Sequence, residues 1–144
     1  MEQRIQIDQL QPEAFKAMYE LENYLAKSQL TKTHKELIKI RASQINGCAF
    51  CINMHTNSAL KNGETSTRIF LLNAWKETTL FTKEEKIILA ITEEVTLIHK
   101  SGLSSTTYNK ALDVFSKKYI AQIIMTVTVI NAWNRIAIST NKPV

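Results

Sequence analysis

Three side chains able to carry redox chemistry lie within eight positions of one another: Cys48, Cys51 and His55. On a helix, at about 100° per residue, Cys51 and His55 are i and i+4 neighbours, and Cys48 lies within roughly 60° of both in projection. Two thiols at this spacing can close a small disulfide loop, which permits reversible two-electron chemistry. A histidine one turn away can accept or return a proton near neutral pH. The spacing therefore predicts a dithiol site on one helix face.

The expected position of this motif favours reactive thiols. Asn46-Gly47 is a helix stop signal, so a new helix should begin at about Cys48. A cysteine in a first turn faces unpaired N–H groups and the positive end of the helix dipole, which favour its thiolate. On the preceding helix, Glu36 is the nearest candidate carboxylate to orient His55. The helical rise places Glu36 roughly 16 Å and His55 roughly 10 Å from the turn, so we expect a tilted crossing or a bridging water.

Other interpretations of the same residues stay open at this stage. Cys48, nearer the helix start, would be the attacking thiol of a general disulfide oxidoreductase. Cys48, Cys51 and His55, with Glu36 as a fourth ligand, could hold zinc in a non-catalytic oligomeric helical module. The two cysteines could also be small buried hydrophobic residues. Glu36 lies three residues after Thr33, which fits a capping box whatever the chemistry.

The remaining sequence predicts an all-α, single-domain bundle of about six to seven helices around this motif. Apolar residues recur every three to four positions, and capping residues separate the segments. The second and third helices should form a helical hairpin, with the cysteine motif at the N-terminus of the hairpin's second helix. The leader through residue 11 should be irregular and residues 73–81 a packed loop. The expected helices are Pro12–Leu25, Thr33–Asn46, Cys48–Asn62, Thr65–Leu72, Thr82–Gly102, a sixth from Ser104 or Ser105 to Phe115, and Ser116–Trp133.

Length and composition limit the class of protein. The 144 residues suffice for one compact domain over 1–144, and 44% hydrophobic residues with only 3 Gly favour a helical globular protein. Polar side chains interrupt the most apolar stretch, Ile120–Ile138, which predicts a buried helix and not a membrane span. The net charge is +5, but lysines and arginines are scattered, so we expect no nucleic-acid binding. The first residues lack the pattern of a secretory signal, so we expect a cytoplasmic protein.

Charged residues outside the motif have mainly structural interpretations. Arg41 and Arg135 lie in otherwise apolar helical stretches, which predicts buried ion pairs, with Glu93 or Glu94 as candidate partners, or a subunit interface. The other two histidines, at positions 34 and 99, have no partner pattern and are expected at the surface or at helix ends.

The chain resembles the alkylhydroperoxidase D-like group of the carboxymuconolactone decarboxylase family. The resemblance rests on Glu36, then Ile40-Arg41-Ala42-Ser43-Gln44-Ile45-Asn46-Gly47-Cys48-Ala49-Phe50-Cys51, then His55 and Ala59. It is strongest over residues 33–63, and the later segment Asn131-Ala132-Trp133-Asn134-Arg135 is also similar to short members of the family.

This resemblance implies an all-helical subunit that forms homo-oligomers and reduces hydroperoxides, with electrons from a dithiol such as a lipoyl or thioredoxin-like protein. By position, it implies that Cys51 becomes the sulfenic acid, that Cys48 closes the disulfide, and that His55 and Glu36 relay protons. It implies no cofactor and no metal. The family's best-known peroxidases carry a histidine between the two cysteines, where this chain has Ala49-Phe50. The family's lactone decarboxylases lack the cysteine pair, so decarboxylation is not expected here.

Overall fold

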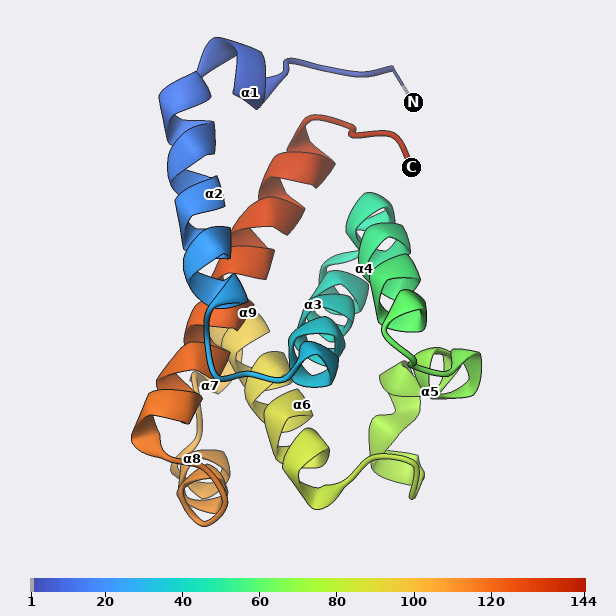
Figure 1. Cartoon of the computed structure of the whole chain (residues 1–144), viewed down its shortest axis with the longest axis vertical. Coiled ribbons are helices and arrows are strands. Elements are labelled where there is room, and N and C mark those ends of the chain that lie inside the picture. Colours follow the sequence, from blue (N-terminus) through green and yellow to red (C-terminus); the bar gives the residue numbers. More distant parts are fainter. Residues whose placement is uncertain (1) are drawn as a thin grey trace.

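The computed structural model describes residues 2–144, and every regular element in that range is helical (Figure 1). Six helices there have eight residues or more, which confirms the predicted all-α fold. In chain order the elements are α1 (Ile7–Leu10), α2 (Pro12–Ala26), α3 (Lys32–Asn46), α4 (Ala49–Lys61), α5 (Ser66–Phe70), the 3₁₀ helix η1 (Leu72–Glu77), α6 (Lys83–Thr96), α7 (Ile98–Ser101), α8 (Ser105–Leu112) and α9 (Lys117–Ser139).

The central element is α3, which packs against α4, α6 and α9. Its apolar residues face two sides. Ile38 is fully buried in one cluster with Ile88 of α6, whereas Leu37 and Ile40 belong to a second cluster with Leu72. Because each buried aliphatic side chain contributes about 1.5–3 kcal/mol, this two-sided burial fixes α3 firmly within the bundle.

The turn between α3 and α4 forms as predicted. Gly47 ends α3 with φ at 71°, a left-handed conformation that L side chains rarely adopt. The Cys48 N–H donates to the Ser43 carbonyl over 3.0 Å, and Cys48 is the N-cap of α4. The helical hairpin and the place of the cysteine motif at the N-terminus of its second helix are therefore confirmed.

The predicted capping box at Thr33 and Glu36 is wrong. α3 begins two residues earlier than expected, with Thr31 as N-cap, whose hydroxyl accepts a hydrogen bond of 3.1 Å from the His34 N–H. Thr33 and Glu36 consequently lie inside the helix. Thr31 and Thr33 are both suitable N-cap residues. Glu36, three residues after Thr33, completes a capping-box pattern and therefore favoured Thr33 in the prediction. The carboxylate of Glu36 is thereby free for other contacts.

Most other predicted boundaries are correct to within a few residues. Pro12 opens α2, Thr82 makes a full capping box with Glu85, and Ser104 and Ser116 cap α8 and α9. Four details differ. A short α1 interrupts the expected irregular leader, and the expected loop at 73–81 begins inside η1. α6 ends at residue 96, followed by the separate turn α7, and α9 continues past Trp133 to Ser139. Within residues 2–144, no helix is both long enough and apolar enough to cross a bilayer.

The two ends of the chain lie close together beside α2 and α9 (Figure 1). The Arg4 N–H donates to the Thr140 carbonyl over 3.1 Å, and the side-chain amide of Asn141 donates to the Glu2 carbonyl over 3.0 Å. The N-terminal segment therefore ties down the residues that follow α9.

Candidate active site

Cys48 and Cys51 form a disulfide at the start of α4, with their Cα atoms 5.4 Å apart. Both are almost inaccessible, with 1% and 2% of their surface exposed. The Cys51 N–H lies 3.4 Å from the Cys48 sulfur, so the first-turn backbone points a donor at it. Ala42, Ile130 and Ala137 pack around the pair. The predicted thiol pair is thus assembled, in its oxidised form.

His55 and Glu36 are in direct contact across the hairpin. The His55 Nδ1 lies 3.0 Å from Glu36 Oε2, and the Ser58 hydroxyl donates to Glu36 Oε1 over 2.7 Å. No bridging water is needed between the two side chains. The difference in height along the hairpin that the sequence predicted is removed by the way α3 and α4 cross. Ser58 was not predicted, although its position three residues after His55 places it on the same face of α4.

The carboxyl group of Glu36 is held in its charged form. Burial raises the pKa of Glu36, but the hydrogen bonds from His55 and Ser58 outweigh burial, and the resulting pKa lies below the ordinary value of 4.5. A charged carboxylate at Nδ1 favours a proton on that nitrogen. The other ring nitrogen, Nε2, is then the one available to exchange a proton with a reacting group.

This lowered pKa predicts how stability depends on pH. A carboxyl whose pKa falls on folding stabilises the protein fully above its unfolded pKa, and that contribution is lost as the pH falls through the lower folded pKa. We therefore expect the free energy of unfolding to decrease as the pH falls below about 4.5. Urea denaturation at pH 7 and at stepwise lower pH measures this loss. Glu36→Gln should reduce the slope, and an unchanged slope in that variant would contradict the assignment.

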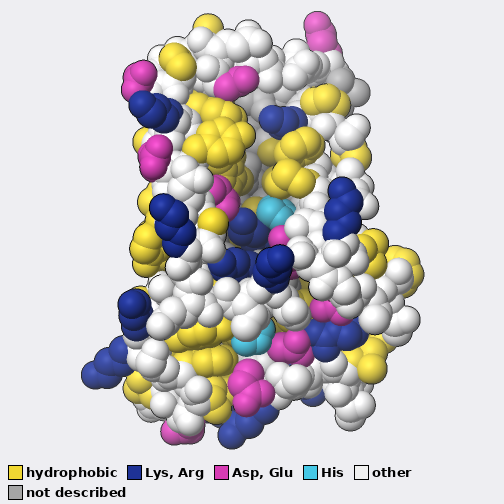
Figure 2. Space-filling model, viewed as in Figure 1, with side chains coloured by type: hydrophobic (Ala, Val, Ile, Leu, Met, Phe, Trp, Pro, Cys, Tyr) yellow, Lys and Arg dark blue, Asp and Glu magenta, His cyan; other side chains and the backbone are white. Residues whose placement is uncertain are grey.

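A cavity of about 350 Å³ opens beside Cys51 and His55. The other two predicted residues, Cys48 and Glu36, are not among its lining residues. Most of its walls are apolar and come from α2, α4 and α9: Phe15, Tyr19, Phe50, Met54, Ile130 and Trp133. Figure 2 shows hydrophobic side chains on both sides of a hollow that has a histidine at its base. The cavity gives a small apolar molecule access to one cysteine and to the histidine.

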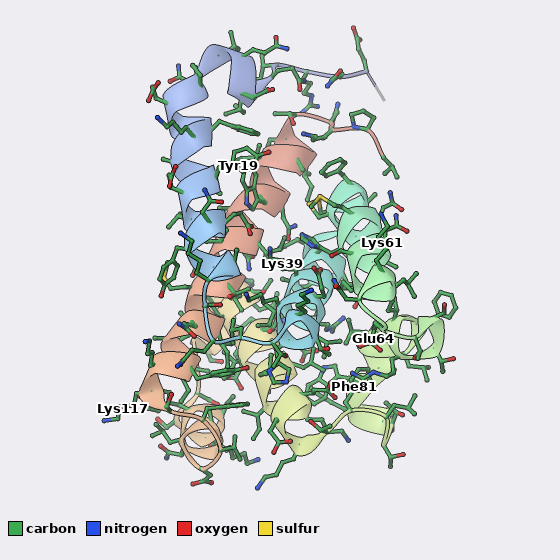
Figure 3. The ribbon with its side chains drawn as sticks, in the orientation of Figure 1. Tyr19, Lys39, Lys61, Glu64, Phe81 and Lys117 are labelled. Atoms are coloured by element: carbon green, nitrogen blue, oxygen red, sulfur yellow. A yellow bond between two sulfur atoms is a disulfide. The ribbon has the colours of Figure 1, made fainter. Side chains whose placement is uncertain are left out.

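A polar group closes one side of the cavity. Lys39 donates to Glu22 Oε2 over 2.8 Å, and the indole N–H of Trp133 donates to Glu22 Oε1 over 3.1 Å. The edge-to-face contact of the Phe15 and Trp133 rings, with centroids 5.2 Å apart, adds to this link. Figure 3 shows Lys39 on α3 and Tyr19 on α2, on the side where α2 and α9 face α4. The contacts join α2 to α3 and α9 over the site.

This polar group was not predicted from sequence. Glu22, Lys39 and Trp133 come from three helices, and no spacing rule links them. Only the tertiary packing brings them together.

The charged residues that the sequence singled out outside the motif do not line the cavity. Arg41 pairs with Glu93 at 2.8 Å, as predicted. Arg135 makes no such ion pair and instead donates to the oxygens of Asn131. His34 lies 2.7 Å from a tyrosine hydroxyl of α9. Burial lowers the pKa of His34, although nearby glutamates raise it. The Arg41 and His34 contacts link α3 to α6 and α9, whereas the Arg135 contact lies within α9.

The residues that a zinc site would need are engaged in other bonds. The cysteine sulfurs are joined to each other, and Glu36 holds His55 and Ser58. Within residues 2–144, no three histidine, cysteine or acidic side chains gather so that they could hold a metal ion.

Comparison with known proteins identifies the family of this chain. The family model described as the carboxymuconolactone decarboxylase family matches residues 12–94, which include all four predicted site residues. The chain belongs to this family. A curated relative, the uncharacterized protein YdfG of Bacillus subtilis (strain 168), is 40% identical over 139 residues and is matched over 96% of this chain and 95% of its own length.

Two solved structures share the fold of this family member. ATU0492 from Agrobacterium tumefaciens is a protein of unknown function for which a role in antioxidant defence as AhpD has been suggested. Its structure matches this one with a TM-score of 0.95 and 37% sequence identity, and the match covers 99% of each chain. An uncharacterized peroxidase-related protein from Silicibacter sp. TM1040 has a TM-score of 0.75, with 90% of this chain and 67% of that chain covered. At 23% identity, the second similarity supports the fold alone.

Proposed function

We propose that this protein is a thiol-dependent peroxidase that reduces hydroperoxides with the Cys48–Cys51 pair. The observation that carries the proposal is the shared cavity: Cys51 and His55 both line it, and Glu36 holds His55 from behind. The family membership and the antioxidant role suggested for ATU0492 agree with this function.

The reaction follows from these positions. In the reduced protein, the Cys51 thiolate attacks the outer peroxide oxygen and breaks the O–O bond, giving a Cys51 sulfenic acid and an alkoxide. His55 lies one turn from Cys51 and supplies the proton that converts the alkoxide into an alcohol. The Cys48 thiol then gives its proton to His55 and attacks the Cys51 sulfur, which forms the disulfide. The hydroxide that leaves Cys51 takes that proton from His55 and departs as water. A dithiol returns two electrons by thiol–disulfide exchange.

The accessibility of the sulfurs favours this function over general disulfide exchange. Both cysteines are almost buried, but only Cys51 lines the cavity, so Cys48 has no open path to a protein disulfide. A hydroperoxide is small enough to reach Cys51 through the cavity. The same argument applies to the reductant, which favours a small dithiol, or a lipoyl dithiol on a flexible arm, over a thioredoxin-like protein. Such a cycle suits a cytoplasmic protein, because that compartment keeps thiols reduced.

Two assays test the function. Reduced protein is mixed with one equivalent of cumene hydroperoxide, and both thiols should disappear together with one alcohol formed per disulfide. Steady-state turnover is then compared with dihydrolipoamide and with thioredoxin as reductants. Absence of thiol loss and of turnover with every reductant would refute the proposal.

We also propose that the protein forms homo-oligomers. α2 buries only Leu25 among its fifteen residues and leaves Tyr19, Leu21 and Tyr24 exposed. Exposed apolar side chains gathered on one helix are typical of a contact with another subunit. Light scattering on the purified protein, with Leu21→Glu as a disrupting variant, tests the assembly.

A further inference from the structure

Lys142 is held at the cavity by the way α9 ends. The Asn141 N–H donates to the Ile138 carbonyl over 3.2 Å, the Lys142 N–H donates to the Ala137 carbonyl over 2.9 Å, and Asn141 has φ at 51°. This pair of bonds around a left-handed residue is a Schellman motif, which turns the chain back along the helix. Lys142 then lines the cavity together with Cys51.

The N-terminal segment fixes this position further. Asn141 donates to the Glu2 carbonyl, and the Arg4 guanidinium donates to the Ser139 carbonyl over 3.2 Å. The ammonium group of Lys142 lies 4.9 Å from the centroid of the Phe50 ring, a cation–π contact between the C-terminal tail and α4. Lys142 is thus an exposed cation with a defined place at the cavity, although it lies in a terminal tail.

The two lysines of the cavity differ in their charge balance. Lys39 is neutralised by Glu22 at 2.8 Å. Within residues 2–144, Lys142 makes no ion pair with an acidic side chain. Its charge is therefore available to a ligand, beside walls that are otherwise mostly apolar.

We propose that the preferred substrates are organic hydroperoxides that carry a carboxylate, with Lys142 as the residue that selects them. This inference rests on the proposed peroxidase function. The apolar body of such a molecule contacts Phe15 and Trp133, its peroxide group reaches Cys51, and its carboxylate pairs with Lys142. Because the ammonium is exposed, the pairing gives a moderate preference, which weakens as salt screens it.

A binding experiment tests this selectivity without any turnover. 4-Isopropylbenzoate and the neutral 4-isopropylbenzamide are titrated against the oxidised protein at low salt, with calorimetry or tryptophan fluorescence as the readout. We expect the carboxylate to bind roughly two- to fivefold more tightly than the amide. Lys142→Gln should remove this preference, and Lys142→Arg should keep it.

The control is Lys117→Gln, which makes the same change in net charge at the start of α9, far from the C-terminal tail (Figure 3). Equal binding of the two ligands by the wild-type protein, or a preference retained in Lys142→Gln, would overturn the proposal. Kinetics with cumene hydroperoxide and its para-carboxylate then separate the two claims. Turnover of both without preference contradicts the selectivity alone, whereas a binding preference without turnover contradicts the peroxidase function alone.

Discussion

Replacement of Cys51 by serine is expected to reduce hydroperoxide turnover at least about a thousandfold, because the attacking sulfur is lost and a serine hydroxyl stays protonated at neutral pH. The expectation rests on position: Cys51 lines the cavity and Cys48 does not. The volume change is small, so the fold should persist. The measurement is the rate of thiol-dependent consumption of cumene hydroperoxide, with circular dichroism as a check on folding.

Cys48→Ser provides the matched control. Its Cys51 thiol should still react once with hydroperoxide, but the sulfenic acid then has no neighbouring thiol and accumulates. Trapping with dimedone followed by mass spectrometry detects it on residue 51. Turnover retained in Cys51→Ser, or sulfenic acid formed on Cys48 in that variant, would reverse the two roles.

The features of the site that could be predicted are those that are local in sequence. Cys48, Cys51 and His55 lie on one helix, so helical periodicity fixes their relation before any tertiary structure is known. The turn before them was also predictable, because Asn46-Gly47 encodes a left-handed helix end. The carboxylate partner required a second helix. The hairpin predicted that this partner is Glu36. The direct contact between Glu36 and His55 depends on the angle at which α3 and α4 cross, which the helical rise alone does not give.

Other features depended on packing between distant segments. The Glu22, Lys39 and Trp133 contacts join three helices, and Lys142 reaches the cavity only because a helix end folds back. Such contacts are set by how helices cross. The mistaken cap of α3 has a local cause: Thr31 and Thr33 both suit an N-cap, and the sequence pattern does not distinguish them.

The spacer between the cysteines also acquires a structural meaning. Where the family's best-known peroxidases carry a histidine, this chain has Ala49-Phe50. Phe50 lines the cavity and holds the ammonium of Lys142 over its ring. Phe50 thus adds an apolar wall to the cavity in place of an ionisable side chain. In the proposed mechanism, the proton transfer is then left to His55. The rate should then depend strongly on the residue that orients His55.

Glu36→Gln is accordingly expected to reduce kcat about 10- to 100-fold with a much smaller effect on KM. The amide keeps the shape of the side chain, but it removes the negative charge that stabilises a proton on His55 as the proton is transferred. Glu36 does not line the cavity, so it acts through His55 as a positioning residue. Steady-state kinetics and the solvent deuterium isotope effect measure the change, since slower proton transfer alters the isotope effect.

Ser58→Ala is the control for this variant, because it removes one donor to Glu36 while the contact with His55 remains. It should lower stability by about 1 kcal/mol, measured by urea denaturation, and leave kcat within about a factor of three. A purely structural Glu36 would give the opposite pattern: Glu36→Gln would be less stable yet turn over at the wild-type rate once folded. That result would assign proton transfer to His55 alone, and the hydrogen bond across the hairpin would then serve only to hold α3 against α4.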